Sequence, residues 1–326
     1  MSTVRAMKMS SFSRRKFIFA AACASWTFHS FPTRCGAAPR TVGLGFSLYG
    51  MKTIGLGAAL KALAEIGYDC VELPVMEGWP GDSAKLARAD RDALRGQLAE
   101  RGMRLGALME NLPALGDEAH HQANLGRLAR ACELAHDLEP AKKADAAPSS
   151  PIIETILGGK AGEFEAVKES LVKRLQDWEK VAAAARVTLA VKAHIGNATQ
   201  RTEQLKWLLE QIASPWLKAA YDYSHFQLQN LTIKETLEAM LPLSAFIHVK
   251  DTEQAAGKRG FLLPSEGTID YLEMFKLLKQ SSYGGDVVVE VSSQVSNRAG
   301  YDPFAAASKC YNHLADAFSK TGLPRG

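Results

Sequence analysis

Short runs of apolar, often β-branched residues alternate with longer amphipathic stretches along the chain from residue 42 onward. The stretch 164–185 is expected to be a helix because its apolar residues recur at helical spacing (Val167, Leu171, Leu175, Trp178, Ala182). A last helix is expected at about 303–319. Eight runs have the length and composition of strands: 42–48, 69–75, 104–109, 152–157, 187–193, 217–222, 245–250 and 286–291.

Strict alternation of strands and helices implies parallel strands joined by helical crossovers. The length suits a (β/α)₈ TIM barrel of roughly 250 residues with modest loop insertions. A doubly wound open sheet is the alternative, but no Gly-x-Gly-x-x-Gly motif opens a helix in this sequence. The segment 139–151 is expected to be a surface connection. We therefore predict an α/β protein with a single barrel domain over residues 39–326.

The first 38 residues have the pattern of an export signal. Ser13-Arg14-Arg15-Lys16-Phe17 is followed by a short apolar run, and Gly36-Ala37-Ala38 supplies the small residues of a cleavage site. Adjacent arginines before a Phe resemble a twin-arginine signal. The apolar run is shorter than the roughly 20 residues that span a membrane. We expect a signal peptide in residues 1–38, contact with the twin-arginine export machinery, no stable membrane insertion and a periplasmic location. The alternative is a basic, disordered tail.

The net charge changes sign when this leader is set aside. The full sequence has 39 Lys and Arg against 35 Asp and Glu, a net charge of +4. Six basic and no acidic residues precede residue 39, which leaves 33 basic and 35 acidic residues, or −2. This balance disfavours nucleic acid as a partner. Three of the five cysteines follow the leader without a CxxC motif and are expected to be buried thiols: Cys70, Cys132 and Cys310.

Charged and polar residues stand near the ends of the predicted strands. In a (β/α)₈ barrel the carboxyl ends of the strands converge on one pocket, where active sites lie. Period-two alternation places Lys192 with His194, and His248 with Lys250, on common faces of their strands. Together these positions predict a functional pocket. Its candidate residues are Glu72, Lys192, His194, Asp222, His225, His248, Lys250 and Glu290.

Three of these residues suit a metal ion. A carboxylate inside an apolar strand, such as Glu290, is costly to bury unless it is paired or bound to metal. Asp222, His248 and Glu290 come from three consecutive predicted strands, and this mixed oxygen and nitrogen set suits Mn²⁺, Zn²⁺, Co²⁺ or Mg²⁺. Each also has a structural explanation: an ion pair for Glu290, loop capping for Asp222 and a hydrogen-bonded core position for His248.

The sequence resembles the xylose isomerase-like (β/α)₈ family of sugar phosphate isomerases and epimerases. The resemblance rests on residues 68–73, 190–194, 222–225, 248–251, 266–270 and 289–291, and it covers nearly all of the chain after the leader. It implies a metal held by Asp222, His248 and Glu290, with His225 near the substrate. It also implies a fourth ligand, a Glu on the fifth strand, but this sequence has Lys192 there.

Lys192 leaves three alternatives open. A three-ligand metal site can persist, with Lys192 binding a substrate oxygen. Alternatively, the Lys192 ammonium replaces the metal and stabilises an enediolate while Glu290 acts as the base, or a lysine of lowered pKa acts as a base itself. In the third alternative catalysis is lost and a sugar-binding barrel remains.

Further contacts with a substrate are expected around the barrel mouth. Trp79, in the loop after the second strand, is placed to stack on a sugar ring. Lys258 and Arg259 lie in a loop that can reach an anionic or polyhydroxylated substrate, and for either residue alone a solvated basic loop is the favoured explanation.

The leading hypothesis is an exported carbohydrate isomerase or epimerase that removes a proton next to a carbonyl. Glu290 is the expected base, with Lys192 and His225 as the other catalytic candidates. Glu72, His194 and Lys250 are expected to bind the substrate. The alternatives are a dehydratase or other lyase acting on a keto-sugar, and a non-catalytic sugar-binding protein. A periplasmic location would argue against a phosphorylated sugar.

Overall fold

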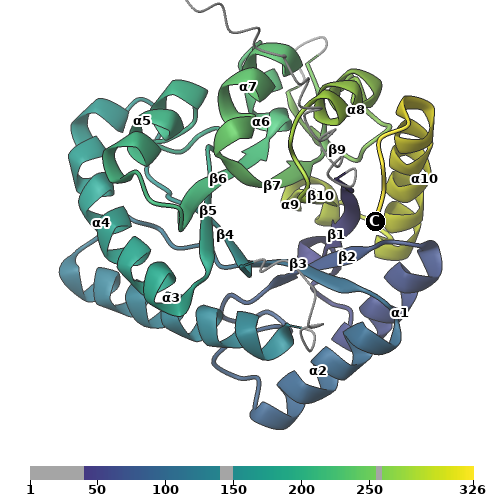
Figure 1. The fold of residues 1–326 in the computed structure, drawn as a ribbon, viewed down its shortest axis with the longest axis horizontal. Coiled ribbons are helices and arrows are strands. Elements are labelled where there is room, and N and C mark those ends of the chain that lie inside the picture. The colour runs from purple at the N-terminus through teal and green to yellow at the C-terminus, as the bar shows by residue number, and fades with distance from the viewer. Residues whose placement is uncertain (1–39, 140–149, 255–258) are drawn as a thin grey trace, which may run out of the picture. The chain divides into compact units, whose positions relative to one another are not determined.

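The computed structural model describes residues 40–139, 150–254 and 259–326. Within these residues, eight parallel strands close into a barrel in the order β1-β10-β7-β6-β5-β4-β3-β2, and helices surround it (Figure 1). The predicted (β/α)₈ TIM barrel is therefore confirmed. The predicted signal peptide in residues 1–38, and Lys258, lie outside the described residues.

The barrel strands agree with the eight predicted runs to within two residues at each end. They are β1 Gly43–Ser47, β2 Cys70–Pro74, β3 Arg104–Met109, β4 Ile152–Ile156, β5 Thr188–Lys192, β6 Leu217–Asp222, β7 Ser244–Val249 and β10 Asp286–Val289. The helices that follow them are α1 Leu56–Ile66, α2 Arg88–Glu100, α3 Glu118–Leu138, α4 Phe164–Ala185, α5 Thr202–Ile212, α7 Ile233–Met240, α8 Tyr271–Gln280 and α10 Pro303–Thr321. Shorter helical turns are α6 Tyr223–Gln227, α9 Ser293–Ser296, Leu48–Met51 and Leu241–Leu243.

Helix α4 has the predicted bounds, and α10 continues two residues past the predicted end. The side chain of Asp302 begins α10 by accepting hydrogen bonds from the backbone N–H groups of Phe304 and Ala305. The helix ends at Gly322, whose φ of 62° is the left-handed conformation that glycine adopts without strain.

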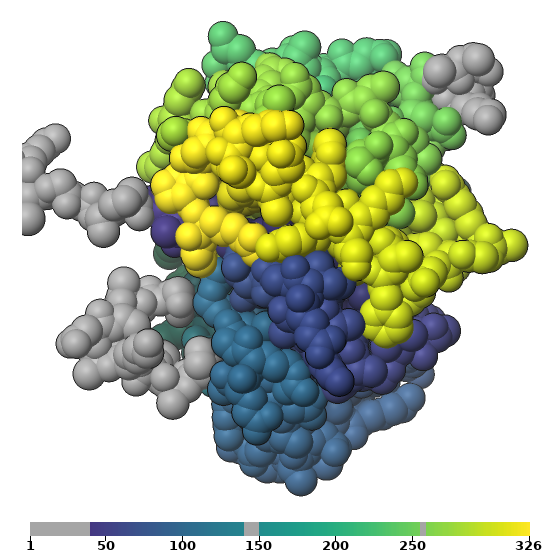
Figure 2. Space-filling model, turned by 90° about the vertical axis from the view of Figure 1, so that its right-hand side faces the viewer, coloured from purple at the N-terminus to yellow at the C-terminus, as the bar shows by residue number. Residues whose placement is uncertain are grey.

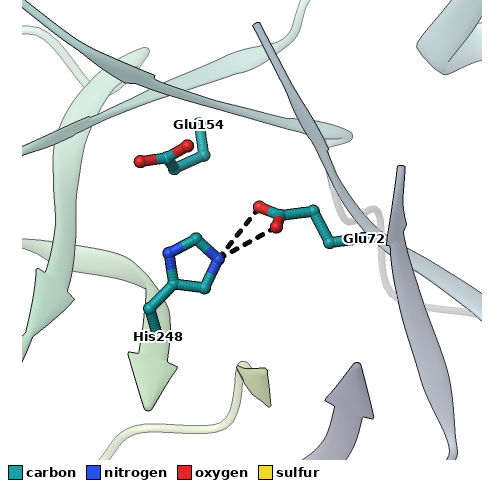
Figure 3. Close-up of side chains that lie close together, drawn as sticks. All are labelled: Glu72, Glu154 and His248. Carbon is teal, nitrogen blue, oxygen red and sulfur yellow. Dashed lines mark hydrogen bonds and ion pairs between the residues drawn. The ribbon is translucent and has the colours of Figure 1, made fainter. Parts of the chain in front are cut away.

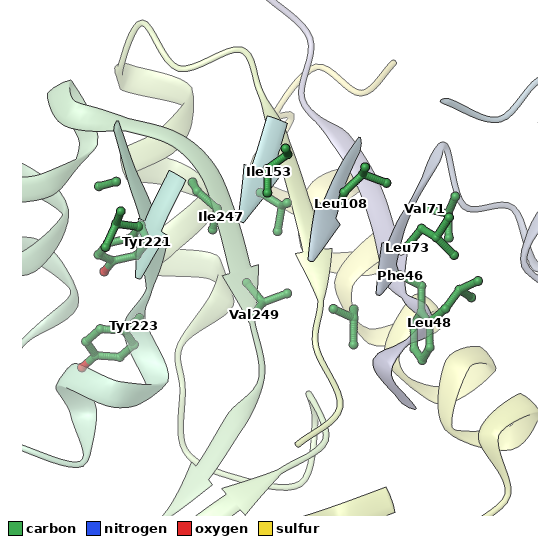
Figure 4. Close-up of a cluster of buried hydrophobic side chains, with 14 of the residues drawn as sticks. Phe46, Leu48, Val71, Leu73, Leu108, Ile153, Tyr221, Tyr223, Ile247 and Val249 are labelled. Atoms are coloured by element: carbon green, nitrogen blue, oxygen red, sulfur yellow. The ribbon is translucent and has the colours of Figure 1, made fainter. Parts of the chain in front are cut away.

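The outward-facing side chains of the strands form the main core with the helices. Phe46, Leu108, Ile247 and Val249 are buried between the barrel wall and its cover (Figure 4). Period-two alternation sends the neighbouring residue of each strand to the opposite face, into the barrel. The helices therefore bury one face of each strand, and the barrel interior is left for a second, separate group of side chains.

A small apolar group fills the barrel interior on the side of the strand amino termini, and we call it the inner apolar layer. Its members are Cys70, Ala107, Ala190, Ala220, Phe246 and Val288. Strand β1 contributes no side chain here, because a Cβ on Gly45 would lie 2.5 Å from Sγ of Cys70 and 2.9 Å from Cγ2 of Val288. Glycine at this position therefore allows three strands to approach one another closely.

A two-stranded hairpin after β7 was not predicted from the sequence. It pairs β8 Asp251–Glu253 with β9 Gly260–Leu262. The buried carboxylate of Asp251 accepts hydrogen bonds from the backbone N–H groups of Thr252 and Ile269. Asp251 therefore joins the hairpin to the segment that leads into α8, which gives it a structural role.

The end of the chain closes the barrel beside its beginning. Helix α10 lies against α1 (Figure 2), and the hydroxyl of Tyr68 donates a hydrogen bond to the carbonyl oxygen of Ala307 over 2.9 Å. At the opposite end from the strand carboxyl termini, Arg104 forms a paired hydrogen bond with the carboxylate of Asp286, at 3.0 and 3.2 Å. This ion pair ties β3 to β10 across the base of the barrel.

The described residues include no helix that is both long and apolar enough to span a bilayer. Cys70, Cys132 and Cys310 are buried free thiols, as predicted. Burial raises the pKa of each of them, so these thiols stay protonated at neutral pH.

Candidate active site

Charged side chains fill the barrel interior directly above the inner apolar layer. Most stand two residues further along their strands than an apolar member, as Lys192 follows Ala190 and His248 follows Phe246. As whole residues, all of them are at most 9% exposed. We call this group the charged layer: Glu72, Glu154, Lys192, Asp222, His248, Lys250 and Glu290.

Lys192, at the end of β5, lies at the centre of the charged layer. Its Nζ is 3.1 Å from Oε1 of Glu154 and 3.1 Å from Oε2 of Glu290. It also donates a hydrogen bond to Nδ1 of His248 over 3.1 Å. Burial disfavours the charged ammonium, but the carboxylates of Glu154 and Glu290 outweigh it and raise the pKa of Lys192. Lys192 is thus a fixed cation, and the alternative in which its pKa is lowered is wrong.

Lys250 is the second cation of the layer. Its ammonium donates hydrogen bonds to Oδ2 of Asp222 and, over 2.5 Å, to Oε2 of Glu290. Burial disfavours ionisation of Glu290, but the ammonium groups of Lys192 and Lys250 hold its pKa well below the usual range. Lys250 likewise outweighs burial and lowers the pKa of Asp222. Both carboxylates are therefore ionised at neutral pH.

His248 lies between an anion and a cation. Its Nε2 is 3.0 and 3.1 Å from the two carboxylate oxygens of Glu72 (Figure 3). Because Lys192 can only donate, Nδ1 is the acceptor and Nε2 carries the proton donated to Glu72. Burial opposes a charged imidazole, but Glu72 and Glu290 outweigh it and raise the pKa of His248.

Glu154, on β4, was not among the predicted site residues. Both of its carboxyl oxygens are buried and make no hydrogen bond in the described structure, although Lys192 lies nearby. Burial raises its pKa. The signal that identified Glu290, a carboxylate inside an apolar strand, is also present in Ile152-Ile153-Glu154-Thr155-Ile156.

Comparison with known proteins identifies the family of the chain. The sequence matches the xylose isomerase-like TIM barrel family over residues 60–309. The chain belongs to this family. The L-ribulose-5-phosphate 3-epimerase UlaE of Escherichia coli O157:H7 is 26% identical to it over 275 residues, which are 81% of this chain and 90% of the relative.

Two solved structures show that this xylose isomerase-like barrel shares its fold with other proteins. The IolI protein with a bound zinc atom has a TM-score of 0.70 and 18% sequence identity, covering 86% of this chain and 99% of that chain. The apo form of 3-keto-D-glucoside 4-epimerase YcjR from Escherichia coli has a TM-score of 0.66 and 15% identity, covering 86% of this chain and 100% of that chain. At these identities the likeness establishes the fold alone.

In this xylose isomerase-like barrel, the three predicted metal ligands do come together. Candidate donor atoms of Asp222, His248 and Glu290 lie within 4.8 Å of one another, and a second set of Glu72, Glu154 and His248 shares the same histidine. Asp222 and His248 are register partners on β6 and β7. The sequence therefore predicted the convergence of these side chains correctly.

The ammonium groups occupy the positions around these donors. Lys192 contacts His248 and Glu290, and Lys250 contacts Asp222 and Glu290, so every predicted ligand already faces a lysine. A metal-bound histidine commonly donates its other N–H to a carboxylate, and His248 does so to Glu72 with the Lys192 ammonium on the metal-facing side. A divalent cation bound here would stand beside two permanent positive charges. The side chains as arranged do not fit it.

His194 and His225 lie together beside the charged layer, with ring centroids 4.1 Å apart. Nδ1 of His225 accepts a hydrogen bond from the N–H of Ile195, so Nε2 carries the proton and lies 3.4 Å from Oδ2 of Asp222. Burial lowers the pKa of His225 to about 4 and that of His194 to about 2. Both rings are therefore neutral near pH 7.

The residues that were predicted to bind the substrate have different surroundings in the structure. Glu72 and Lys250 are fully engaged inside the charged layer, as partners of His248 and of Asp222 with Glu290. Trp79 is half-buried and stacks on Tyr49, with ring centroids 4.8 Å apart, so Tyr49 covers one face of the indole. Arg259 is exposed on the segment that leads into β9.

Proposed function

We propose that the chain is a carbohydrate isomerase or epimerase that moves a proton on a carbon next to a carbonyl, with Glu290 as the base. The proposal follows from membership of the family and from the similarity to an L-ribulose-5-phosphate 3-epimerase over most of both chains. In this proposal the ammonium groups of Lys192 and Lys250 stabilise the negative charge that forms during the reaction.

One observation carries this proposal. The side chain of Glu290 is 12% exposed, whereas the side chains of Lys192 and Lys250 are 2% and 3% exposed and that of Asp222 is fully buried. Glu290 is thus the member of the charged layer that a substrate at the mouth reaches first. It is also ionised, as a general base must be before it accepts a proton.

The proton transfer follows from these contacts. Glu290 takes the proton from the carbon, the bonding electron pair forms the carbon–carbon double bond of an enediolate, and the carbonyl oxygen gains negative charge. The ammonium groups of Lys192 and Lys250, both hydrogen-bonded to Glu290, stabilise that charge from fixed positions. As Glu290 becomes neutral, its attraction for the two ammonium groups weakens. Both ammonium groups are then free to donate hydrogen bonds to the new oxyanion.

Return of the proton decides the product. Delivery to the former carbonyl carbon by the same carboxyl group, with transfer of the hydroxyl proton from one oxygen of the enediolate to the other, completes an isomerisation. Delivery to the original carbon from the opposite face completes an epimerisation. Both reactions share the enediolate formed by Glu290, and epimerisation needs in addition a proton donor on the opposite face of the sugar.

The test is exchange of substrate hydrogen with solvent. The protein is incubated in D₂O with a panel of ketopentoses, ketohexoses and their phosphates, and NMR follows both deuterium incorporation and product identity. We expect exchange with at least one sugar, and a loss of about 10²-fold or more in Glu290→Gln. The matched control is Glu238→Gln, on the exposed face of α7, which retains the wild-type rate.

Each alternative has its own result in this experiment. Binding of sugars without exchange across the panel contradicts the proposal and identifies a sugar-binding protein. A product that has lost water identifies a dehydratase, in which the first proton abstraction is shared but the isomerase assignment is wrong.

We further propose that residues 1–38 are a twin-arginine signal and that the barrel acts in the periplasm. The proposal rests on the sequence pattern around Arg14 and Arg15. Cell fractionation of the wild type and of a double Arg14→Lys, Arg15→Lys variant tests it. We expect the double variant to stay in the cytoplasm, and equal export of both proteins would contradict the proposal.

A further inference from the structure

The two ammonium groups of the charged layer have the same arrangement of partners. Lys250 contacts the carboxylates of Glu290 and Asp222. Lys192 contacts the carboxylates of Glu290 and Glu154. Within the described residues, no further carboxylate oxygen lies within 4.0 Å of either ammonium group. The two lysines therefore share Glu290, and each has a second carboxylate of its own.

The two second carboxylates are less accessible than the shared one. The side chains of Asp222 and Glu154 are fully buried, whereas that of Glu290 is 12% exposed. In the register of β4 with β5, Glu154 lies beside Ala190, a member of the inner apolar layer, two residues before Lys192. A substrate at the mouth therefore meets Glu290 before it meets Glu154.

The ion pair with Lys192 compensates for the burial of Glu154. Oε1 of Glu154 is 3.1 Å from Nζ of Lys192, and neither carboxyl oxygen of Glu154 makes a hydrogen bond within the described structure. Burial of a carboxylate that lacks hydrogen bonds is unfavourable, and native structures keep few such groups. Burial raises the pKa of Glu154, and the ammonium group of Lys192 is the foremost charge that opposes this rise. Lys192 is thus the main described partner that favours the ionised form of Glu154.

One of the two carboxylates beside Lys192 loses its charge during the proposed reaction. When Glu290 accepts the proton, its hydrogen bond with the Lys192 ammonium weakens. The hydrogen bond to Nδ1 of His248 remains, but this nitrogen carries no negative charge. Glu154 lies away from the mouth and takes no part in the proton transfer. It is therefore the carboxylate that can hold Lys192 beside the new oxyanion.

We propose that Glu154 is a positioning residue that holds the ammonium group of Lys192 in place while Glu290 is neutral. The inference rests on the proposed function, because neutralisation of Glu290 belongs to that reaction. It assigns to Glu154 the part for Lys192 that Asp222 has for Lys250. A charge that is already held in place stabilises an oxyanion without a cost of reorganisation. None of the ligands that the family resemblance implies lies on the fourth strand, so this role is specific to the present side chains.

The kinetics of deuterium exchange measure this role in catalysis. Glu154→Gln keeps the shape of the side chain and removes its charge. We expect kcat to fall by about 10- to 100-fold, the usual effect of losing a group that orients a site residue. KM is expected to stay within about twofold of wild type, because Glu290 still holds Lys192 before the proton moves.

Two further variants separate the charge of Glu154 from a merely structural part. Glu154→Asp restores the charge and is expected to recover part of the lost kcat. Glu238→Gln, on the exposed face of α7, is the matched control and keeps the kcat and KM of wild type. A structural role would lower the fraction of folded protein and would leave kcat per folded molecule unchanged.

NMR of the lysine ammonium groups tests the positioning without turnover. Glu290→Gln imitates the site after proton transfer, because its side chain is permanently neutral. In protein with isotope-labelled lysine, the ammonium signal of Lys192 is assigned by its absence from Lys192→Arg. We expect this signal to be retained in Glu290→Gln and lost, through exchange with water, when Glu154→Gln is added. The signal of Lys250, which keeps Asp222 as its partner, is the internal control and persists in both variants.

The results that would overturn the inference differ from those that contradict the proposed function. Wild-type kcat in Glu154→Gln would show that the charge of Glu154 has no part in the reaction. Loss of the Lys192 signal in Glu290→Gln alone, or its retention in the double variant, would show that Glu154 does not hold the ammonium group. Exchange by the wild type leaves the proposed function standing in each of these cases. Absence of exchange in the wild type contradicts the proposed function, and the NMR comparison still decides whether Glu154 holds Lys192.

Discussion

The ammonium group of Lys192 and the imidazole of His248 are joined by a hydrogen bond of 3.1 Å in which nitrogen donates to nitrogen. This contact fixes the tautomer of His248, because Nδ1 must keep its lone pair and Nε2 must carry the proton donated to Glu72. It also places a permanent positive charge on the side of the ring that faces Asp222 and Glu290. The negative charges of Glu154 and Glu290 are thereby balanced by a lysine of the chain itself.

Replacement of this lysine by the residue that the family resemblance implies is the sharpest test of the ammonium role. Wild-type protein is expected to contain no stoichiometric divalent metal. Lys192→Glu is expected to gain it, because a carboxylate replaces the charge that competes with a cation and becomes the fourth ligand beside Asp222, His248 and Glu290. Metal analysis of both purified proteins, and thermal unfolding with and without Mn²⁺ or Zn²⁺, provide the measurement.

Lys192→Met is the control for that substitution. It removes the charge without adding a ligand and leaves Glu154 and Glu290 without their shared cation, so we expect a loss of about 3–5 kcal/mol in unfolding free energy. Stoichiometric metal in the wild type that disappears in Asp222→Ala and His248→Ala would contradict the ammonium assignment.

Acid is expected to destabilise the fold through two buried histidines. The pKa of His225 lies near 4 and that of His194 near 2, below the ordinary value of about 6.5. The unfolded chain therefore binds more protons than the folded chain as pH falls from 6.5 towards 4, and stability falls with it. For His225 the loss by pH 4 is about 3 kcal/mol. Urea unfolding at several pH values between 7.5 and 4.5 measures the slope.

The variant His225→Asn is expected to flatten that slope, and His120→Asn, an exposed histidine on α3, is expected to leave it unchanged. The range ends at pH 4.5 because Asp222 and Glu290, whose pKa values are lowered, lose their own stabilising charge only at lower pH. The raised pKa values of His248 and Glu154 act in the opposite direction, favouring the fold as pH falls. An unchanged slope in His225→Asn would contradict the assignment.

Loss of the ion pair between Arg104 and Asp286, at the amino-terminal end of the barrel, is expected to lower stability without changing catalysis. Arg104→Met leaves the largely buried carboxylate of Asp286 without its paired hydrogen bonds, which we expect to cost about 1–3 kcal/mol in unfolding free energy. Deuterium exchange by the folded variant stays within about twofold of wild type, because the inner apolar layer separates this pair from the charged layer. A variant of normal stability that had lost exchange would contradict this division of roles.

The sequence alone was sufficient to predict the barrel, because alternation and periodicity are local properties of the chain. Period two also predicts which side chains point inwards, and Lys192, Asp222, His248 and Glu290 do converge. The hairpin of β8 and β9 was missed because strands of three residues are too short to show alternation.

The partners of the charged residues could not be predicted in the same way. An ion pair with a lysine was the alternative to metal binding for Glu290, and the structure gives it two such partners, Lys192 and Lys250. These contacts depend on how the closed barrel brings β5, β7 and β10 together. The direction of the pKa of Lys192 depends on the same geometry, since burial alone would lower it. Tyr49, in the short turn Leu48–Met51, and Trp79, in the segment after β2, stand outside the strands, where no period relates one residue to another.

The inner apolar layer has a consequence for how dissolved ions reach the site. Its small side chains, with Gly45 allowing Cys70 and Val288 to meet, close the barrel beneath the charged layer. Counter-ions that screen exposed charges over about 10 Å at 0.1 M salt can therefore enter only from the mouth. Once a substrate fills the mouth, the charges beneath it are isolated from the buffer. Capture of the substrate is thus expected to depend on ionic strength more strongly than the proton transfer that follows.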